Sequence, residues 1–259
     1  MTLSLEQLSA RMRQGEDIPL SDTARIALAL SIPSILEQLV VTAMEYIDAA
    51  MVGHIGAEAT AAIGIVSSST WLLHGILVGL YTAFSIQIAQ YLGAKHDEKV
   101  SQTVQTAIIL SVALGVLLTV IGELIVYPAF LILDVPLDVY DMAESYLRIF
   151  LLGLPFLSLY NFEAAIFRSC GDSKTPLYSL VIANGLNIVL GFLSVAVFDF
   201  GVIGVAWATV IAYAANSLIL LVLLCRTKDR IRVNLRDLHF SKDELGRIIR
   251  IGLPAGFRA

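Results

Sequence analysis

Two acidic residues, Glu45 and Asp48, stand three positions apart in the apolar stretch TAMEYIDAAMVGHIG, residues 42–56. On a helix this spacing places them about 60° apart on one side, and Glu37 falls about 20° from Asp48. A charge at the centre of a membrane helix costs roughly 2.5–3.5 kcal/mol on insertion scales, so such a residue indicates a functional site. Two carboxyl groups this close repel when both are ionised, which predicts that they exchange a proton as a coupled pair.

Proton exchange by a carboxyl group inside a membrane is the chemistry that proton-coupled transport requires. The three acids share one side of their helix, and lipid would not tolerate that side. We therefore expect it to face a bundle interior or a watery cavity. The structural alternative, a hydrogen bond from each acid to a neighbouring helix, stays open and fits Glu37 best, because Glu37 lies nearest the cytoplasmic end.

Further polar side chains interrupt the apolar segments and could reach the same cavity. We expect Asn184, Asn187 and Thr209 to act with the acids, and the cavity to be lined by Glu37, Gln38, Tyr160 and Asn161. Amides and hydroxyls can also hold membrane helices together, so both roles remain open for these residues.

Three other charged residues are expected to have structural roles. Glu163 is expected to pair with Arg168, which follows it closely in the chain. Arg148 is expected to pair with Asp141 and Glu144 or to extend toward the membrane interface.

The composition explains why intramembrane charges matter in this chain. Of its 259 residues, 57% are hydrophobic and 15% charged, with a mean hydropathy of +0.80, whereas soluble domains carry about 25% charged residues. Six apolar segments are each long enough to cross roughly 30 Å of hydrocarbon: 27–50, 62–91, 102–126, 143–167, 177–198 and 202–225. The sequence predicts an all-α integral membrane protein with a six-transmembrane-helix bundle.

Lysine and arginine residues predict the orientation of this bundle. The loops after the first, third and fifth segments contain neither residue, whereas the N-terminal region and the other loops contain them. This bias predicts a multi-pass protein of the cell (inner) membrane with a cytoplasmic N-terminus.

The chain divides into four predicted regions. These are a cytoplasmic leader at 1–25 with a short surface helix at 4–14, a six-helix lobe at 26–226, a cytoplasmic connector at 227–250 and an incomplete seventh helix at 251–259. Ser241 and Glu244 resemble a helix cap, which predicts a short helix from 242. Pro33 and Pro254 open apolar segments in similar contexts, which predicts a second copy of the lobe as a parallel repeat. The chain is therefore expected to be a fragment of a two-lobe protein.

Motifs of soluble enzymes do not occur in this sequence. There is no phosphate-binding Walker loop, no His-Glu-x-x-His and no Gly-x-Ser-x-Gly, and the four histidines are scattered. We expect neither an enzyme nor a nucleic-acid-binding protein. A membrane-embedded enzyme or a scaffold remains the alternative of another class.

Several short motifs, in order, resemble the N-terminal half of the multidrug and toxic compound extrusion (MATE) family. The resemblance covers about residues 27–259, and its motifs are Ile32-Pro33-Ser34, YIDAAMVG at 46–53, AQYLGA at 89–94, FRSCGDSKTP at 167–176 and GVIGVAWAT at 201–209. It implies a twelve-helix exporter of two six-helix lobes in the lipid bilayer. Such an exporter expels small cationic or amphipathic compounds, driven by inward proton or sodium flow, and needs no cofactor besides the transported ion.

The resemblance also implies roles for individual residues. Asp48 matches a coupling aspartate, Asn187 a helix-five asparagine and Thr209 a helix-six threonine, and these three would be the metal ligands if the protein were sodium-coupled. Gly191 stands where the family often has a further Asp or Asn, which weakens the sodium interpretation more than the proton one. Glu45 stands where an uncharged residue is expected and could compensate.

The alternative function is that of a lipid-linked saccharide or lipid flippase of the wider related superfamily. Such a protein would need a cationic cavity for diphosphate lipids. The predicted spans instead hold acids and have no basic cluster at mid-membrane, which favours cationic cargo.

Overall fold

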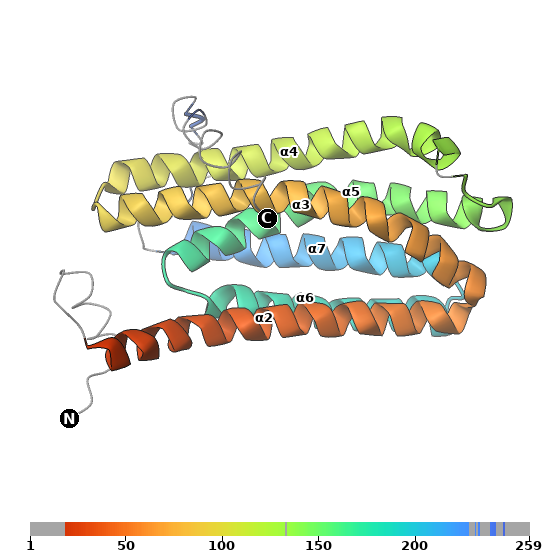
Figure 1. Cartoon of the computed structure of the whole chain (residues 1–259), viewed down its shortest axis with the longest axis horizontal. Coiled ribbons are helices and arrows are strands. Elements are labelled where there is room, and N and C mark those ends of the chain that lie inside the picture. The colour runs from red at the N-terminus through yellow and green to blue at the C-terminus, as the bar shows by residue number, and fades with distance from the viewer. Residues whose placement is uncertain are drawn as a thin grey trace.

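Six long α-helices make up most of the structure, a computed structural model that describes residues 19–132, 134–227, 231, 233, 239–241 and 246. The helices are α2 (Leu20–Ile55), α3 (Ala57–Gly93), α4 (Asp97–Ile132), α5 (Leu137–Ser169), α6 (Lys174–Ala196) and α7 (Gly201–Arg226). They lie side by side, and each runs back along the one before it (Figure 1). The predicted all-α fold class is confirmed.

The helices contain five of the six predicted apolar segments and extend beyond them, and α6 covers the segment 177–198 except for its last two residues. Within the described ranges, α3 to α7 are each long and apolar enough to cross a membrane, and α2 has 36 residues. The helix α4 begins at Asp97, before the predicted segment at 102–126, and its first turn holds Asp97 and Glu98. Polar residues can continue a helix outside hydrocarbon, so an apolar run marks the bilayer rather than the helix end.

The first helix likewise begins at Leu20, inside the region predicted as the leader at 1–25. The backbone N–H groups of Asp22 and Thr23 donate to the carbonyl of Pro19, which supports the first turn. The predicted helix at 4–14 and the segment 251–259 lie outside the described residues, as does the predicted helix from 242 except for Gly246, which is helical.

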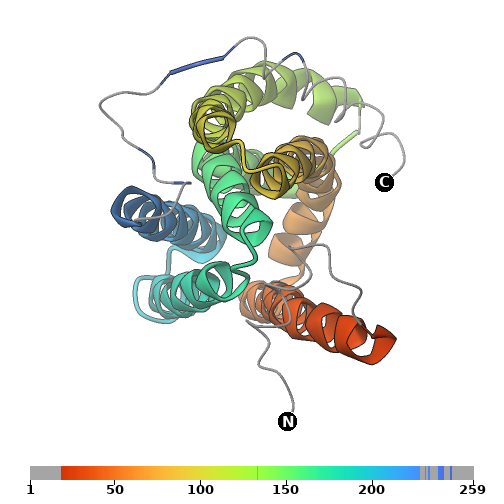
Figure 2. The ribbon, with the colours of Figure 1, turned by 90° about the vertical axis from the view of Figure 1, so that its left-hand side faces the viewer.

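At the centre of the bundle lies α5. Seen end-on, it lies between the α3–α4 pair and the α6–α7 pair, while α2 lies beside α6 (Figure 2). From Asn161 to Phe167 every residue of α5 is buried. Because α5 packs against α3, α4 and α7, its side chains reach both the core and the side of the bundle that faces α2.

Small residues bring α4 and α5 into close contact. A Cβ atom at Gly115 would collide with the backbone of Pro155, and one at Gly122 would lie 2.5 Å from the Leu151 side chain. Between them, Thr119 Oγ1 donates to the carbonyl of Leu151 at 2.6 Å. Spacing of small residues one turn apart is typical of tightly packed membrane helices.

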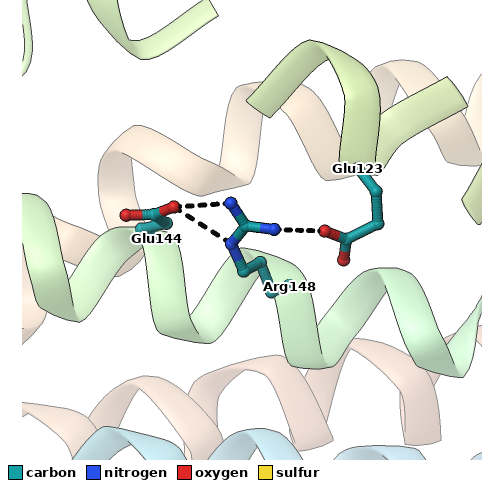
Figure 3. Close-up of polar contacts among 3 residues, drawn as sticks. All are labelled: Glu123, Glu144 and Arg148. Carbon is teal, nitrogen blue, oxygen red and sulfur yellow. Dashed lines mark hydrogen bonds and ion pairs between the residues drawn. The ribbon is translucent and has the colours of Figure 1, made fainter. Parts of the chain in front are cut away.

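An ion-pair cluster joins the same two helices directly beside the contact of Gly122 with Leu151 (Figure 3). Arg148 of α5 donates to Glu144 Oε1 at 2.7 and 3.0 Å and to Glu123 of α4 at 2.5 Å. The predicted pairing with Glu144 is confirmed, but the second partner is Glu123 rather than Asp141. The sequence alone does not indicate the pairing with Glu123, because Glu123 lies 25 residues before Arg148.

The chain after α7 folds back onto the bundle. Ile231 and Val233 are buried in the hydrophobic cluster that includes Phe84, Phe162 and Leu220. The Val233 N–H donates to the Leu224 carbonyl at 3.2 Å. Further on, the backbone N–H groups of 239 and 241 donate to the Gln105 and Thr106 side chains of α4 at 2.9 and 3.3 Å.

Candidate functional site

A cavity of about 660 Å³ opens between α2, α3, α5, α6 and α7. Its wall includes every residue that the sequence predicted for the site or its lining, namely Glu37, Gln38, Glu45, Asp48, Tyr160, Asn161, Asn184, Asn187 and Thr209. These residues come from α2, α5, α6 and α7, and α3 and α4 separate α2 from the other three in the chain, so the fold brings them together.

The acids of α2 meet different environments. Met44 beside them is buried, Glu45 is exposed at the cavity, and Asp48 is half-buried. Asp48 Oδ1 is buried and has no hydrogen-bond partner among the residues that the structure describes. A buried oxygen without a partner is costly, so this atom is well placed to bind a proton or a ligand.

Polar contacts connect α6 to α7 at the cavity wall. Asn187 Nδ2 donates to Thr209 Oγ1 at 3.4 Å, and Thr209 Oγ1 donates to the Val205 carbonyl at 3.1 Å. Within the described part of the chain, Asn187 Oδ1 and Asn184 Nδ2 are buried without partners. Asn187 and Thr209 therefore join two helices and still leave one amide oxygen available.

A close contact between α2 and α6 relates the positions of Asp48 and Asn187 along the two helices. A Cβ atom at Gly191 would lie 2.9 Å from Met51 Cε and 3.3 Å from its sulfur. Asp48 precedes Met51 by about one turn, and Asn187 precedes Gly191 by about one turn. Because α2 and α6 run in the same direction (Figure 1), Asp48 and Asn187 lie at similar levels on the two helices.

Aromatic side chains form much of the remaining wall, and of these the sequence singled out Tyr160 but not Trp71, His74 or Tyr213. Tyr160 stacks on Tyr213 with ring centroids 6.1 Å apart, and Trp71 meets His74 edge-on at 6.4 Å. All four line the cavity. On an apolar helix an aromatic residue fits lipid, core or cavity equally well, so the sequence carried no signal that could have separated these roles.

The predicted pair of Glu163 and Arg168 is wrong. Arg168 Nη1 donates instead to Glu37 Oε1 of α2 at 2.7 Å, and both residues line the cavity. Five residues on a helix correspond to a rotation of about 140°, so Glu163 and Arg168 point in different directions. Gly171, with φ +84°, then ends α5 through its N–H bond to the Arg168 carbonyl.

Glu163 is left fully buried in the described structure, with neither carboxyl oxygen hydrogen-bonded. If this carboxyl has no function, Glu163→Met should stabilise the protein by about 1–3 kcal/mol, because an unsatisfied polar group is replaced by an apolar one of similar size. Thermal unfolding in detergent would show a higher Tm. A lower Tm, or lost transport with normal folding, would contradict the prediction and assign the carboxyl a role.

Comparison with known proteins places this geometry in a family. Residues 33–193 match the model of the MatE family. The probable multidrug resistance protein YoeA of Bacillus subtilis is 32% identical over 232 residues, covering 86% of this chain and 50% of that protein. The multidrug export protein MepA of Staphylococcus aureus is 27% identical over 192 residues, covering 73% of this chain and 43% of that protein.

Solved structures of transporters also resemble this chain. An outward-facing conformation of a multidrug resistance MATE family transporter of the MOP superfamily superposes with a TM-score of 0.82 at 29% identity, over 88% of this chain and 51% of that one. The chain thus spans about half the length of the relatives it matches. Since the family model covers more than half of the chain, this multi-pass membrane protein belongs to the MatE family.

Proposed function

We propose that this protein exports small cationic or amphipathic compounds and that inward movement of protons, or of sodium ions, drives the export. The observation that carries this proposal is the cavity, whose wall holds three carboxylates, Glu37, Glu45 and Asp48, beside stacked tyrosines. Carboxylates attract organic cations, and aromatic faces bind them through cation–π contacts. Transport breaks no covalent bond, so no catalytic residue is assigned.

Asp48 is the coupling carboxylate in this proposal. A carboxyl group that gains and loses a proton during the cycle changes the charge of the cavity by one, and this changes its affinity for a cation. Asn187 and Thr209 face the same cavity from α6 and α7. Asn184 and Glu45 complete the coupling group, with Glu45 supplying a second negative charge.

Proton coupling suits the available atoms better than sodium coupling does. Hard cations bind through several oxygen ligands. The buried side-chain oxygens near Asp48 that have no partner in the described ranges are Asp48 Oδ1 and Asn187 Oδ1, with Thr209 Oγ1 as a third ligand. Gly191 contributes none, and the Met51 thioether occupies the space beside it.

Coupling requires that cation and substrate prefer different conformations. In the proposed cycle, a proton reaches Asp48 from outside, α2 shifts against α6 and α7, the substrate leaves, and the proton exits inside. Pro33 removes one backbone hydrogen bond from α2, which makes this helix the expected moving part. A second six-helix lobe is proposed to complete the transporter, which lies in the cell membrane with its N-terminus in the cytoplasm.

The flippase alternative is not supported by the charges in the cavity. Its wall holds one arginine and three acids, whereas a diphosphate lipid would need several cations.

The test is export of a fluorescent organic cation from proteoliposomes with an imposed pH gradient and no sodium. We expect export with the gradient and none after an ionophore dissipates it. Export that follows a sodium gradient and ignores the pH gradient would overturn proton coupling while keeping the exporter. No export under either gradient would overturn the proposed function.

A further inference from the structure

Arg168 brings a positive charge into a cavity that is otherwise acidic. Its guanidinium is part of the cavity wall, with 26% of the side chain exposed. Among the described residues, Nη1 alone has a hydrogen-bond partner, Glu37 Oε1. In the described part of the chain, none of its other nitrogens is both buried and unbonded, so the remaining donors are accessible.

The surroundings of Arg168 hold it in this position. Glu37 binds it from α2, and Tyr81 and Tyr160 line the same part of the wall from α3 and α5. The next residue, Ser169, bonds to Ser85 of α3 at 3.0 Å, which anchors the end of α5. The arginine is thus built into the structure from three helices.

The cavity has unlike charges along its length. Measured along α2, Glu45 lies about 12 Å and Asp48 about 16 Å from Glu37 and its arginine partner. One region therefore offers carboxylates without a cationic partner in the described residues, and another offers guanidinium donors. An elongated molecule could contact both regions at once.

We propose that Arg168 forms an anion subsite, which binds the carboxylate of an elongated zwitterionic substrate whose cationic end faces Glu45 and Asp48. This inference rests on the proposed function and names a substrate class for the same cavity. An arginine suits the role because its planar fork carries five N–H donors, so it can bind Glu37 and a second carboxylate together. Glu37 holds the guanidinium in place and competes for its charge.

Because Glu37 competes for the charge of Arg168, two substitutions should change the affinity for a zwitterion in opposite directions. Arg168→Gln removes the donor fork and the charge, so it should weaken binding of a zwitterion. Glu37→Gln leaves Arg168 charged and without its carboxylate partner, so it should strengthen that binding. A purely structural ion pair predicts something else, namely that both substitutions disturb every ligand alike.

The probe pair is one rhodamine dye as its free carboxylic acid, a zwitterion, and as its methyl ester, a cation. Binding to the purified protein is measured by fluorescence anisotropy at neutral pH. Arg168→Gln should weaken binding of the acid about tenfold relative to the ester, as expected for one charge-assisted hydrogen bond. Glu37→Gln should shift the ratio the other way. Arg226→Gln, at the exposed end of α7, is the control and should leave the ratio unchanged.

Equal Tm values for the variants would establish that they are folded. If the affinities for the acid and the ester change by the same factor in both variants, the proposal of an anion subsite is wrong, although the exporter proposal stands. If the wild-type protein binds neither dye, the cavity is not a substrate site, and the proposed function and this inference are both overturned.

Discussion

Replacing Asp48 with asparagine is expected to reduce export driven by a pH gradient to the level of protein-free liposomes. The amide has nearly the same shape as the carboxyl group and can still form hydrogen bonds. It cannot bind and release a proton near neutral pH, so the cavity would keep one charge state throughout the cycle. Transport of a fluorescent cation and the dissipation of the gradient are measured together.

A matched control separates coupling from folding. Asp138→Asn makes the same chemical change at an exposed position in the first turn of α5, away from the cavity, and should export normally. The Asp48→Asn protein should have the same elution volume and the same Tm as the wild type. If it exports at the wild-type rate and still consumes the gradient, Asp48 is not the coupling residue.

Replacing Gly115 with alanine is expected to destabilise the fold by at least about 3 kcal/mol. The added methyl group would collide with Pro155 backbone atoms, and backbone cannot turn aside as a flexible side chain can. Overpacking of a core costs about 1–3 kcal/mol even where side chains adjust. Thermal unfolding in detergent and the yield of monodisperse protein would report the effect.

Gly185→Ala is the control for this substitution. Gly185 lies in α6 with nothing within 4 Å of the added atom. Since alanine favours helix over glycine by about 1 kcal/mol, this variant should be as stable as the wild type or slightly more so. Equal stability of both variants would mean that α4 and α5 do not pack closely at Gly115.

Some of the fold could be read from the chain because lipid imposes a simple rule. An apolar run of bilayer length predicts a helix almost regardless of its neighbours, and all six runs lie in helices apart from the last two residues of 177–198. The helix ends were less predictable. Asp97 and Glu98 form the first turn of α4, but they are polar, so the apolar pattern did not predict that the helix begins there.

Some residues of the candidate site could likewise be predicted from the sequence, and others could not. Asp48, Asn187 and Thr209 stood out because polar groups are rare in apolar helices, and the structure places them at one cavity. Arg168 was missed because the nearby Glu163 offered a partner for its charge, whereas the rotation along α5 directs Arg168 toward Glu37. Trp71, His74 and Tyr213 were missed because an aromatic side chain in a membrane helix has several suitable environments.

The buried positions of Ile231 and Val233 have a consequence for how the protein is made. The cluster around Phe84 and Phe162 also includes these two residues, which follow α7 in the chain. A ribosome must therefore synthesise past residue 233, beyond the end of α7, before this part of the core can be completed. Until then, α3, α4, α5 and α7 can be inserted in the membrane while the cluster lacks its last two side chains.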